Sequence, residues 1–200
     1  MAYTPYIQFV GCNGVGKTTL IGKLSGHDVN TENTKPTIKS DYVNKQLIIG
    51  SGQDRRDVNV RLYDQQFDMF ASPRSIFRQS DIIILVWSMD DTQTFRSIDE
   101  HLKSIYNIYD SHKHHRPDIV LCANKCDASR NDNEYKLCKA KYKIHFVAKT
   151  SARDGTGINL LESELCKILA VRFNIISEER QTDSVTVSIG PIPRPDFRCC

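Results

Sequence analysis

Short apolar runs alternate with amphipathic stretches along most of the chain. Four of these runs are rich in β-branched residues and too short for helices, which is typical of strands in a parallel sheet. They are Tyr6–Val10, Ile82–Trp87, Ile119–Ala123 and Ile144–Ala148. Residues 41–64 differ, because two alternating segments flank the turn sequence GSGQDRR and so predict a hairpin. We therefore expect a mostly parallel sheet of about six strands with one antiparallel hairpin strand.

Helices are predicted between these strands. The segments are Lys17–Leu24, Thr94–Tyr109, Asn133–Ala140 and Asn159–Phe173. In the last segment, apolar residues at positions 161, 165, 168 and 169 mark one face of a helix. Strands that alternate with helices predict an α/β fold, doubly wound, with helices on both faces of the sheet.

The composition changes after about Ile176. Residues 177–200 contain three prolines within five positions and have no apolar periodicity. This pattern is typical of a flexible tail. We therefore expect one folded domain over residues 1–176 and a tail over residues 177–200.

Composition and charge narrow the classes of protein. Two hundred residues, 40% of them hydrophobic and 26% charged, are ordinary for one globular domain. A formal net charge of +3 gives no electrostatic sign of nucleic-acid binding. We find no apolar run of about 18 residues and no signal-peptide pattern, so we expect a chain that is neither secreted nor membrane-spanning. Seven scattered cysteines favour reduced thiols in a cytosol-type compartment. We also expect a monomeric protein.

A phosphate-binding motif follows the first predicted strand. Residues Gly11–Thr18 match the pattern G-x-x-x-x-G-K-[ST] between a strand and a helix. Backbone N–H groups of such a loop and the start of its helix favour bound phosphate. Lys17 is placed to neutralise the β- and γ-phosphates, and the Thr18 hydroxyl is suited to Mg²⁺. The nucleotide-binding candidates here are Asn13, Gly14, Val15, Gly16, Lys17, Thr18 and Thr19.

A second motif indicates which base accompanies the phosphates. Asn124-Lys125-Cys126-Asp127 follows the predicted strand that ends near Ala123. The Asp127 carboxylate can accept hydrogen bonds from the N1–H and the amino group of guanine, whereas adenine presents an acceptor at N1. Candidates in the next strand-end loop are Ser151, Ala152, whose N–H could meet guanine O6, and Arg153.

Asp64 ends another predicted strand. Ligands of open α/β sheets bind at the carboxyl edge of the strands, where all these segments would meet. Asp64 is therefore the natural carboxylate for Mg²⁺, through a bound water.

The order GCNGVGKT, Thr37, YD, NKCD and SAR resembles the Ras-like small GTPases over residues 5 to about 176. The stretch 72–81, the segment LVWSMDDTQTF and the pair Cys199-Cys200 are similar to the Rab family. The resemblance implies a P-loop NTPase fold, GTP and GDP as ligands with Mg²⁺, and Thr37 as a further magnesium ligand. It also implies a molecular switch in vesicle traffic, whose effectors and regulators bind loops around Thr37 and Asp64–Phe70.

By the same resemblance, residues Asp64–Met69 belong to the second switch loop, where the family usually has the pattern D-T-A-G-Q-E and this chain has DQQFDM. Phe67 stands in place of glycine and restricts the backbone whose N–H would approach the γ-phosphate. Asp68 stands in place of the glutamine that positions the attacking water. We expect slow intrinsic GTP hydrolysis, with a guanine-nucleotide-binding scaffold of little or no turnover as the alternative. A small P-loop kinase is a third possibility, but the chain lacks a lid signature and NKCD conflicts with it.

The cysteine pair predicts lipid anchoring. By the Rab resemblance, Cys199 and Cys200 are prenylation sites, and the tail carries three arginines against four acidic residues. Without a basic patch, one lipid chain binds a membrane only marginally, so stable anchoring needs two. We expect the protein in the cytoplasm and on the cytoplasmic face of an intracellular membrane.

Overall fold

The protein is described from a computed structural model. The description covers residues 3–26, 41–64, 79–110, 116–128, 132–133, 136, 144 and 146–173. The predicted helix Asn133–Ala140 lies largely outside these residues, as does the tail 177–200.

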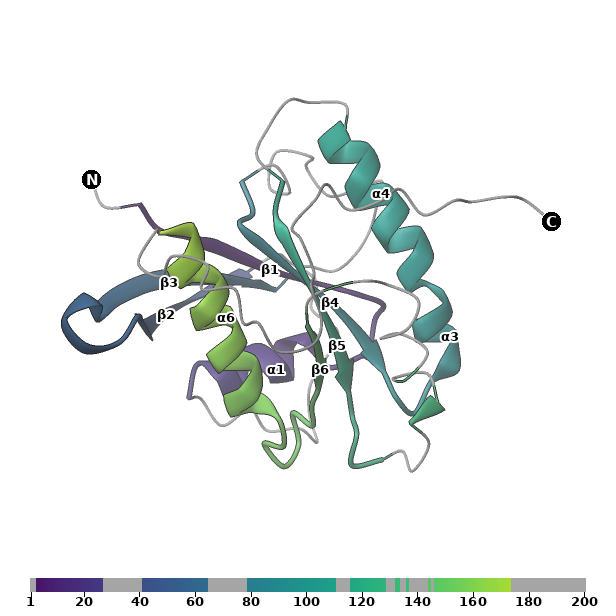
Figure 1. Cartoon of the computed structure of the whole chain (residues 1–200). Helices are drawn as coiled ribbons and strands as arrows, with labels where there is room; N and C mark the ends of the chain where they lie inside the picture. Colours follow the sequence, from purple (N-terminus) through teal and green to yellow (C-terminus); the bar gives the residue numbers. More distant parts are fainter. Residues whose placement is uncertain are drawn as a thin grey trace.

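A six-stranded sheet forms the centre of the molecule, in the order β2-β3-β1-β4-β5-β6 (Figure 1). Its strands are β1 Tyr6–Val10, β2 Asp41–Ile49, β3 Arg56–Asp64, β4 Ile82–Ser88, β5 Asp118–Asn124 and β6 Val147–Lys149. Only the pairing of β2 with β3 is antiparallel. The predicted mixed sheet and its hairpin are confirmed. A short 3-10 helix, η1 Gly52–Asp54, lies in the hairpin turn.

The last strand is shorter than the predicted run Ile144–Ala148. The pairing of β6 with β5 joins Val147 to Leu121 and ends with Lys149 against Ala123. The apolar run therefore begins before the strand does, because hydrophobicity marks burial and not hydrogen-bonded pairing.

Helices cover both faces of the sheet (Figure 1). They are α1 Lys17–Leu24, α3 Thr92–Arg96, α4 Ile98–Asp110 and α6 Ile158–Arg172. The buried residues form two clusters, one between the sheet and α1 with α6, the other between the sheet and α3 with α4. All seven residues of β4 are buried, as expected for a central strand covered on both sides.

The predicted helix Thr94–Tyr109 is two helices. The Asp91 carboxylate accepts a hydrogen bond from the Gln93 N–H and so caps α3. The break falls at Ser97, whose hydroxyl donates to the Thr94 carbonyl at 2.8 Å. Serine hydroxyls compete with the helical backbone in this way, a local effect that apolar periodicity does not reveal.

No helix within the described part of the chain has the length and apolar character needed to span a bilayer.

An ionic cluster centred on the buried Asp81 lies at the end of the sheet where the parallel strands begin. Asp81 accepts hydrogen bonds from the Tyr3 hydroxyl at 2.5 Å and the Tyr6 N–H at 2.8 Å. Arg172, at the end of α6, lies 3.3 Å from Asp81 and 2.6 Å from Asp118. The cluster thus joins the start of β1, the start of β5 and the last helix.

We predict that Asp81→Ala destabilises the fold by about 2–4 kcal/mol, because it removes a buried acceptor and half of the pairing of Arg172. Urea denaturation measures the loss. Glu164→Ala is the matched control, since Glu164 pairs with Lys167, whose side chain is 63% exposed, and its cost should stay below about 0.5 kcal/mol. Equal losses in the two variants would contradict this view of Asp81.

Candidate functional site

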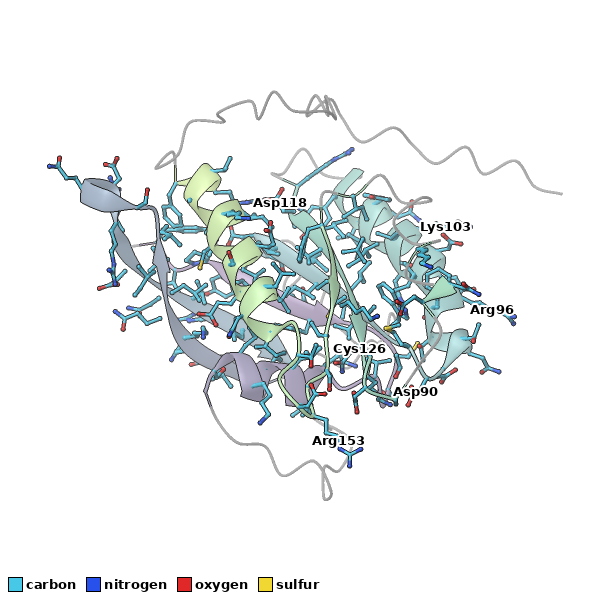
Figure 2. The ribbon with its side chains drawn as sticks, turned by 60° about the horizontal axis from the view of Figure 1, so that its bottom comes forward. Asp90, Arg96, Lys103, Asp118, Cys126 and Arg153 are labelled. Atoms are coloured by element: carbon cyan, nitrogen blue, oxygen red, sulfur yellow. The ribbon has the colours of Figure 1, made fainter. Side chains whose placement is uncertain are left out.

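The residues singled out in the sequence meet at the carboxyl edge of the parallel strands. Gly11 follows β1, Asn124 ends β5 and Thr150 follows β6, while Asp64 ends β3. Figure 2 shows Asp90, Cys126 and Arg153 toward this end of the molecule, with Asp118 at the other end. The edge expected from the topology is therefore the one at which these loops gather.

Lys17 folds back over the phosphate loop. Its Nζ donates to the carbonyl oxygens of Gly11 at 2.8 Å and Cys12 at 2.9 Å. The side chain is buried, which lowers its pKa, and the nearby Asp64 carboxylate partly counteracts this effect. A desolvated cation at the mouth of a loop of backbone N–H groups is suited to bind an anion.

Gly16 sits where a side chain would not fit. Its φ of 95° is left-handed, and an added Cβ would lie 2.4 Å from Asn124 Nδ2. That Nδ2 donates to the Val15 carbonyl at 2.8 Å, so the close approach serves a hydrogen bond. The second glycine of the motif is therefore required by the contact with Asn124 as well as by the turn.

The Asn124 amide joins three loops. Besides its bond to Val15, its Oδ1 accepts from the Thr150 hydroxyl at 3.2 Å and from the Ala152 N–H at 3.1 Å. The sequence suggested the Ala152 N–H as a donor to guanine O6. Because that N–H already points at Asn124, a guanine oxygen would have to share it or replace this bond.

Thr18 and Asp64 provide a pair of hard oxygen ligands. The Thr18 hydroxyl donates to an Asp64 carboxylate oxygen, and Asp64 is buried. Mg²⁺ is held in such sites by one or two protein oxygens together with ligand phosphates and water. The described residues hold no cluster of three or more histidine, cysteine or acidic side chains suited to a metal. This donor set fits Mg²⁺ bound with a phosphate ligand.

The loops expected to bind the base have an exposed side. Asp127 and Arg153 are exposed, whereas Ser151 is buried. The Ser151 N–H donates to the Thr156 carbonyl at 2.9 Å, and its hydroxyl accepts from the Asp154 N–H at 3.3 Å. Ser151 therefore stabilises the conformation of its loop, while the exposed side chains of Asp127 and Arg153 are accessible to a ligand.

Lys125 makes an ion pair that the sequence analysis missed. Its Nζ lies 3.4 Å from the Asp90 carboxylate, which comes from the segment after β4. A signal was present, since Asp90 follows the end of a predicted strand, as the NKCD segment does.

A polar chain lies behind the phosphate loop, and sequence reasoning did not find it either. Cys12 Sγ lies 3.1 Å from the Ser97 hydroxyl, which lies 3.4 Å from His101 Nδ1. Burial, with a smaller effect of the Lys17 charge, lowers the pKa of His101 to about 4. His101 is thus neutral at pH 7 and adds no second cation beside Lys17.

Five predicted site residues lie outside the described residues, namely Thr37, Phe67, Asp68, Cys199 and Cys200. The structure therefore brings together the phosphate loop, the NKCD segment, the SAR segment and Asp64, and the roles of the other five remain predictions.

Comparison with known proteins agrees with this geometry. Residues 7–170 match the Ras family. The chain is 27% identical to Ras-related protein Rab-9A of Canis lupus familiaris and 26% identical to Rab-9A of Homo sapiens, in each case over 97% of this chain and 96% of the relative. It is 26% identical to Ras-related protein RABG1 of Arabidopsis thaliana, over 96% of each chain.

The family match covers most of the chain and includes every strand end that forms the site. The chain therefore belongs to the Ras family and is a Rab-like small GTPase.

Proposed function

We propose that the chain is a membrane-traffic switch that binds GTP and GDP with Mg²⁺ and hydrolyses GTP slowly. One observation carries the proposal: the Asn124 amide of the NKCD segment is bonded to Val15 of the phosphate loop. A guanine-reading loop and a phosphate-binding loop therefore adjoin, as one nucleotide ligand requires.

The phosphates would lie against the N–H groups of residues 13–19 and the Lys17 ammonium. When bound, Mg²⁺ would neutralise phosphate charge, and Thr18 and Asp64 would hold it together with Thr37. The Asp127 carboxylate would read the guanine edge, with Lys125, Ser151, Ala152 and Arg153 around the base.

The second switch supports slow turnover. An ionised Asp68 accepts hydrogen bonds but cannot donate one, and phosphate charge repels it. Phe67 keeps its N–H but lacks the freedom of glycine. The same two residues favour the second candidate function, a nucleotide-stabilised scaffold whose off signal is not hydrolysis.

Tyrosines beside the switches are candidates for partner contacts. Tyr42 and Tyr63 lie opposite each other on β2 and β3, with ring centroids 5.4 Å apart. The Arg61 guanidinium lies 5.4 Å from the Tyr42 ring and from the Tyr6 ring. Because Tyr42 is 47% exposed and follows the Thr37 region in sequence, we place effector binding across this face and the loops around Thr37 and Asp64–Phe70.

Membrane attachment would come from prenyl groups on Cys199 and Cys200. In this arrangement the folded domain spans residues 1–176, and residues 177–200 separate it from the bilayer.

We predict that Gly16→Ala weakens binding of a fluorescent GDP at least about tenfold, because the new Cβ displaces the Asn124 amide in addition to straining the backbone. Gly26→Ala is the control. Its φ of 76° is also left-handed, but nothing lies within 4 Å of an added Cβ. It should change GDP affinity less than about twofold, and equal effects would disprove the proposed contact between the two loops.

Single-turnover hydrolysis tests the switch. We expect the parent protein to hydrolyse GTP well below ~10⁻⁴ s⁻¹ and Asp68→Gln to raise the rate about tenfold or more. Asp68→Asn removes the charge without restoring the reach of glutamine and should give a smaller rise. A parent rate of ordinary size that survives Asp68→Ala would refute this account, and persistent GTP in all variants would favour the scaffold.

Fractionation of cells that express the full chain tests the lipid anchor. Cys199→Ser and Cys200→Ser should each shift the protein partly from membrane to supernatant, and the double variant should shift it fully, since one lipid holds only marginally. Cys166→Ser, a change within α6, should leave the distribution unchanged. Membrane retention of the double variant would show that the anchor lies elsewhere.

A further inference from the structure

The ion pair of Asp90 and Lys125 lies at the rim of the proposed nucleotide site. Lys125 Nζ is 3.4 Å from Asp90 Oδ2, and each side chain is 37% exposed. Lys125 stands between Asn124, which is bonded to the phosphate loop, and Asp127, the predicted guanine-reading carboxylate. The ammonium group held by Asp90 therefore belongs to the same short segment as both of these contacts.

The sheet brings the two residues together. β4 and β5 remain paired up to Ser88 and Asn124, and the Met89 N–H donates to the Asn124 carbonyl at 2.8 Å. Asp90 and Lys125 thus follow the ends of neighbouring strands, just beyond the pair of Ser88 and Asn124. Lys125 also has a φ of 60°, the one positive φ among the described residues other than glycine. Its backbone therefore has a left-handed conformation that residues other than glycine rarely adopt.

Asp90 is itself oriented. The Ser88 hydroxyl donates to Asp90 Oδ1, which leaves Oδ2 for Lys125. Partial burial raises the pKa of Asp90, but the Ser88 hydroxyl and the Lys125 ammonium together outweigh it and hold the pKa below its usual value. The carboxylate is therefore a fixed negative charge at neutral pH.

We propose that Asp90 is a positioning residue that holds the Lys125 ammonium at the rim of the guanine-nucleotide pocket and so prolongs nucleotide residence. The inference rests on the nucleotide binding proposed above. A lysine side chain loses rotamer freedom when a ligand packs against it. If the Asp90 carboxylate already restrains it, less of this entropy is lost on binding.

The position of the pair makes its effect separable from folding. Half-exposed ion pairs contribute little to stability, so loss of this pair should scarcely change the melting temperature. An effect on nucleotide dissociation without an effect on melting is the signature of positioning.

Dissociation of a methylanthraniloyl-labelled GDP from the full chain, in Mg²⁺ at low salt, tests the proposal. Asp90→Asn should release the nucleotide about two- to fivefold faster, and high salt should shrink the difference. Asp91→Asn is the matched control. It removes one negative charge from the adjacent residue, and asparagine still caps α3, so its rate should stay within about 1.5-fold of the parent. Asp90→Glu should restore at least part of the difference.

A double-variant cycle assigns the effect to Lys125. In a Lys125→Met background, Asp90→Asn should add no further acceleration. The proposal is overturned if Asp90→Asn matches Asp91→Asn, if its effect persists without Lys125, or if it lowers the melting temperature of the nucleotide-free protein more than Asp91→Asn does. A parent that retains no guanine nucleotide contradicts the proposed function itself, whereas a parent that retains it with Asp90→Asn unchanged contradicts only the role of Asp90.

Discussion

The carboxamide of Asn124 holds the proposed site together. One side chain donates to the phosphate loop at Val15 and accepts from the segment after β6 at Thr150 and Ala152. Because Asn124 is buried, loss of these bonds would leave unpaired polar groups on several loops at once. Gly16 makes the arrangement possible, since any larger residue would occupy the space of the amide. The position of the proposed phosphate site relative to the proposed base site therefore depends on the hydrogen bonds of Asn124 and on the lack of a Cβ at Gly16.

The charges around this amide are suited to binding an anion. Lys17 is desolvated, and its ammonium group donates to two main-chain carbonyl oxygens of its own loop, which do not neutralise its charge. Asp64 lies close enough to favour the charged lysine and is itself bonded to Thr18. His101 could have added a second positive charge, but burial keeps it neutral at pH 7. The loop thus carries one buried cation and a carboxylate-hydroxyl pair, a combination suited to phosphate with Mg²⁺.

Much of this edge follows from the sequence, because strand ends and short motifs are local signals. The run Tyr6–Val10 and the helix Lys17–Leu24 match the structure at both ends, and the sheet brings their motifs together as topology requires. The failures are of another kind. The helix break at Ser97 depends on a side-chain bond, and β6 is shortened by its pairing with β5. Asp90 escaped notice because its partner Lys125 is distant in sequence, and His101 because its burial beside Lys17 follows from the tertiary structure, which periodicity cannot show.

The ion pairs at the two ends of the sheet differ in burial. Where the parallel strands begin, the largely buried pair of Asp81 and Arg172 joins the last described helix to the start of the sheet, and the exposed Tyr3 donates to the same carboxylate. Where they end, Asp90 with Lys125 is half exposed, and Asp127 is exposed. Buried pairs are costly to break, while exposed ones contribute little to folding. Substitutions at the exposed positions of the carboxyl edge should therefore alter nucleotide binding with little effect on the fold, whereas substitution of the buried Asn124 should affect both.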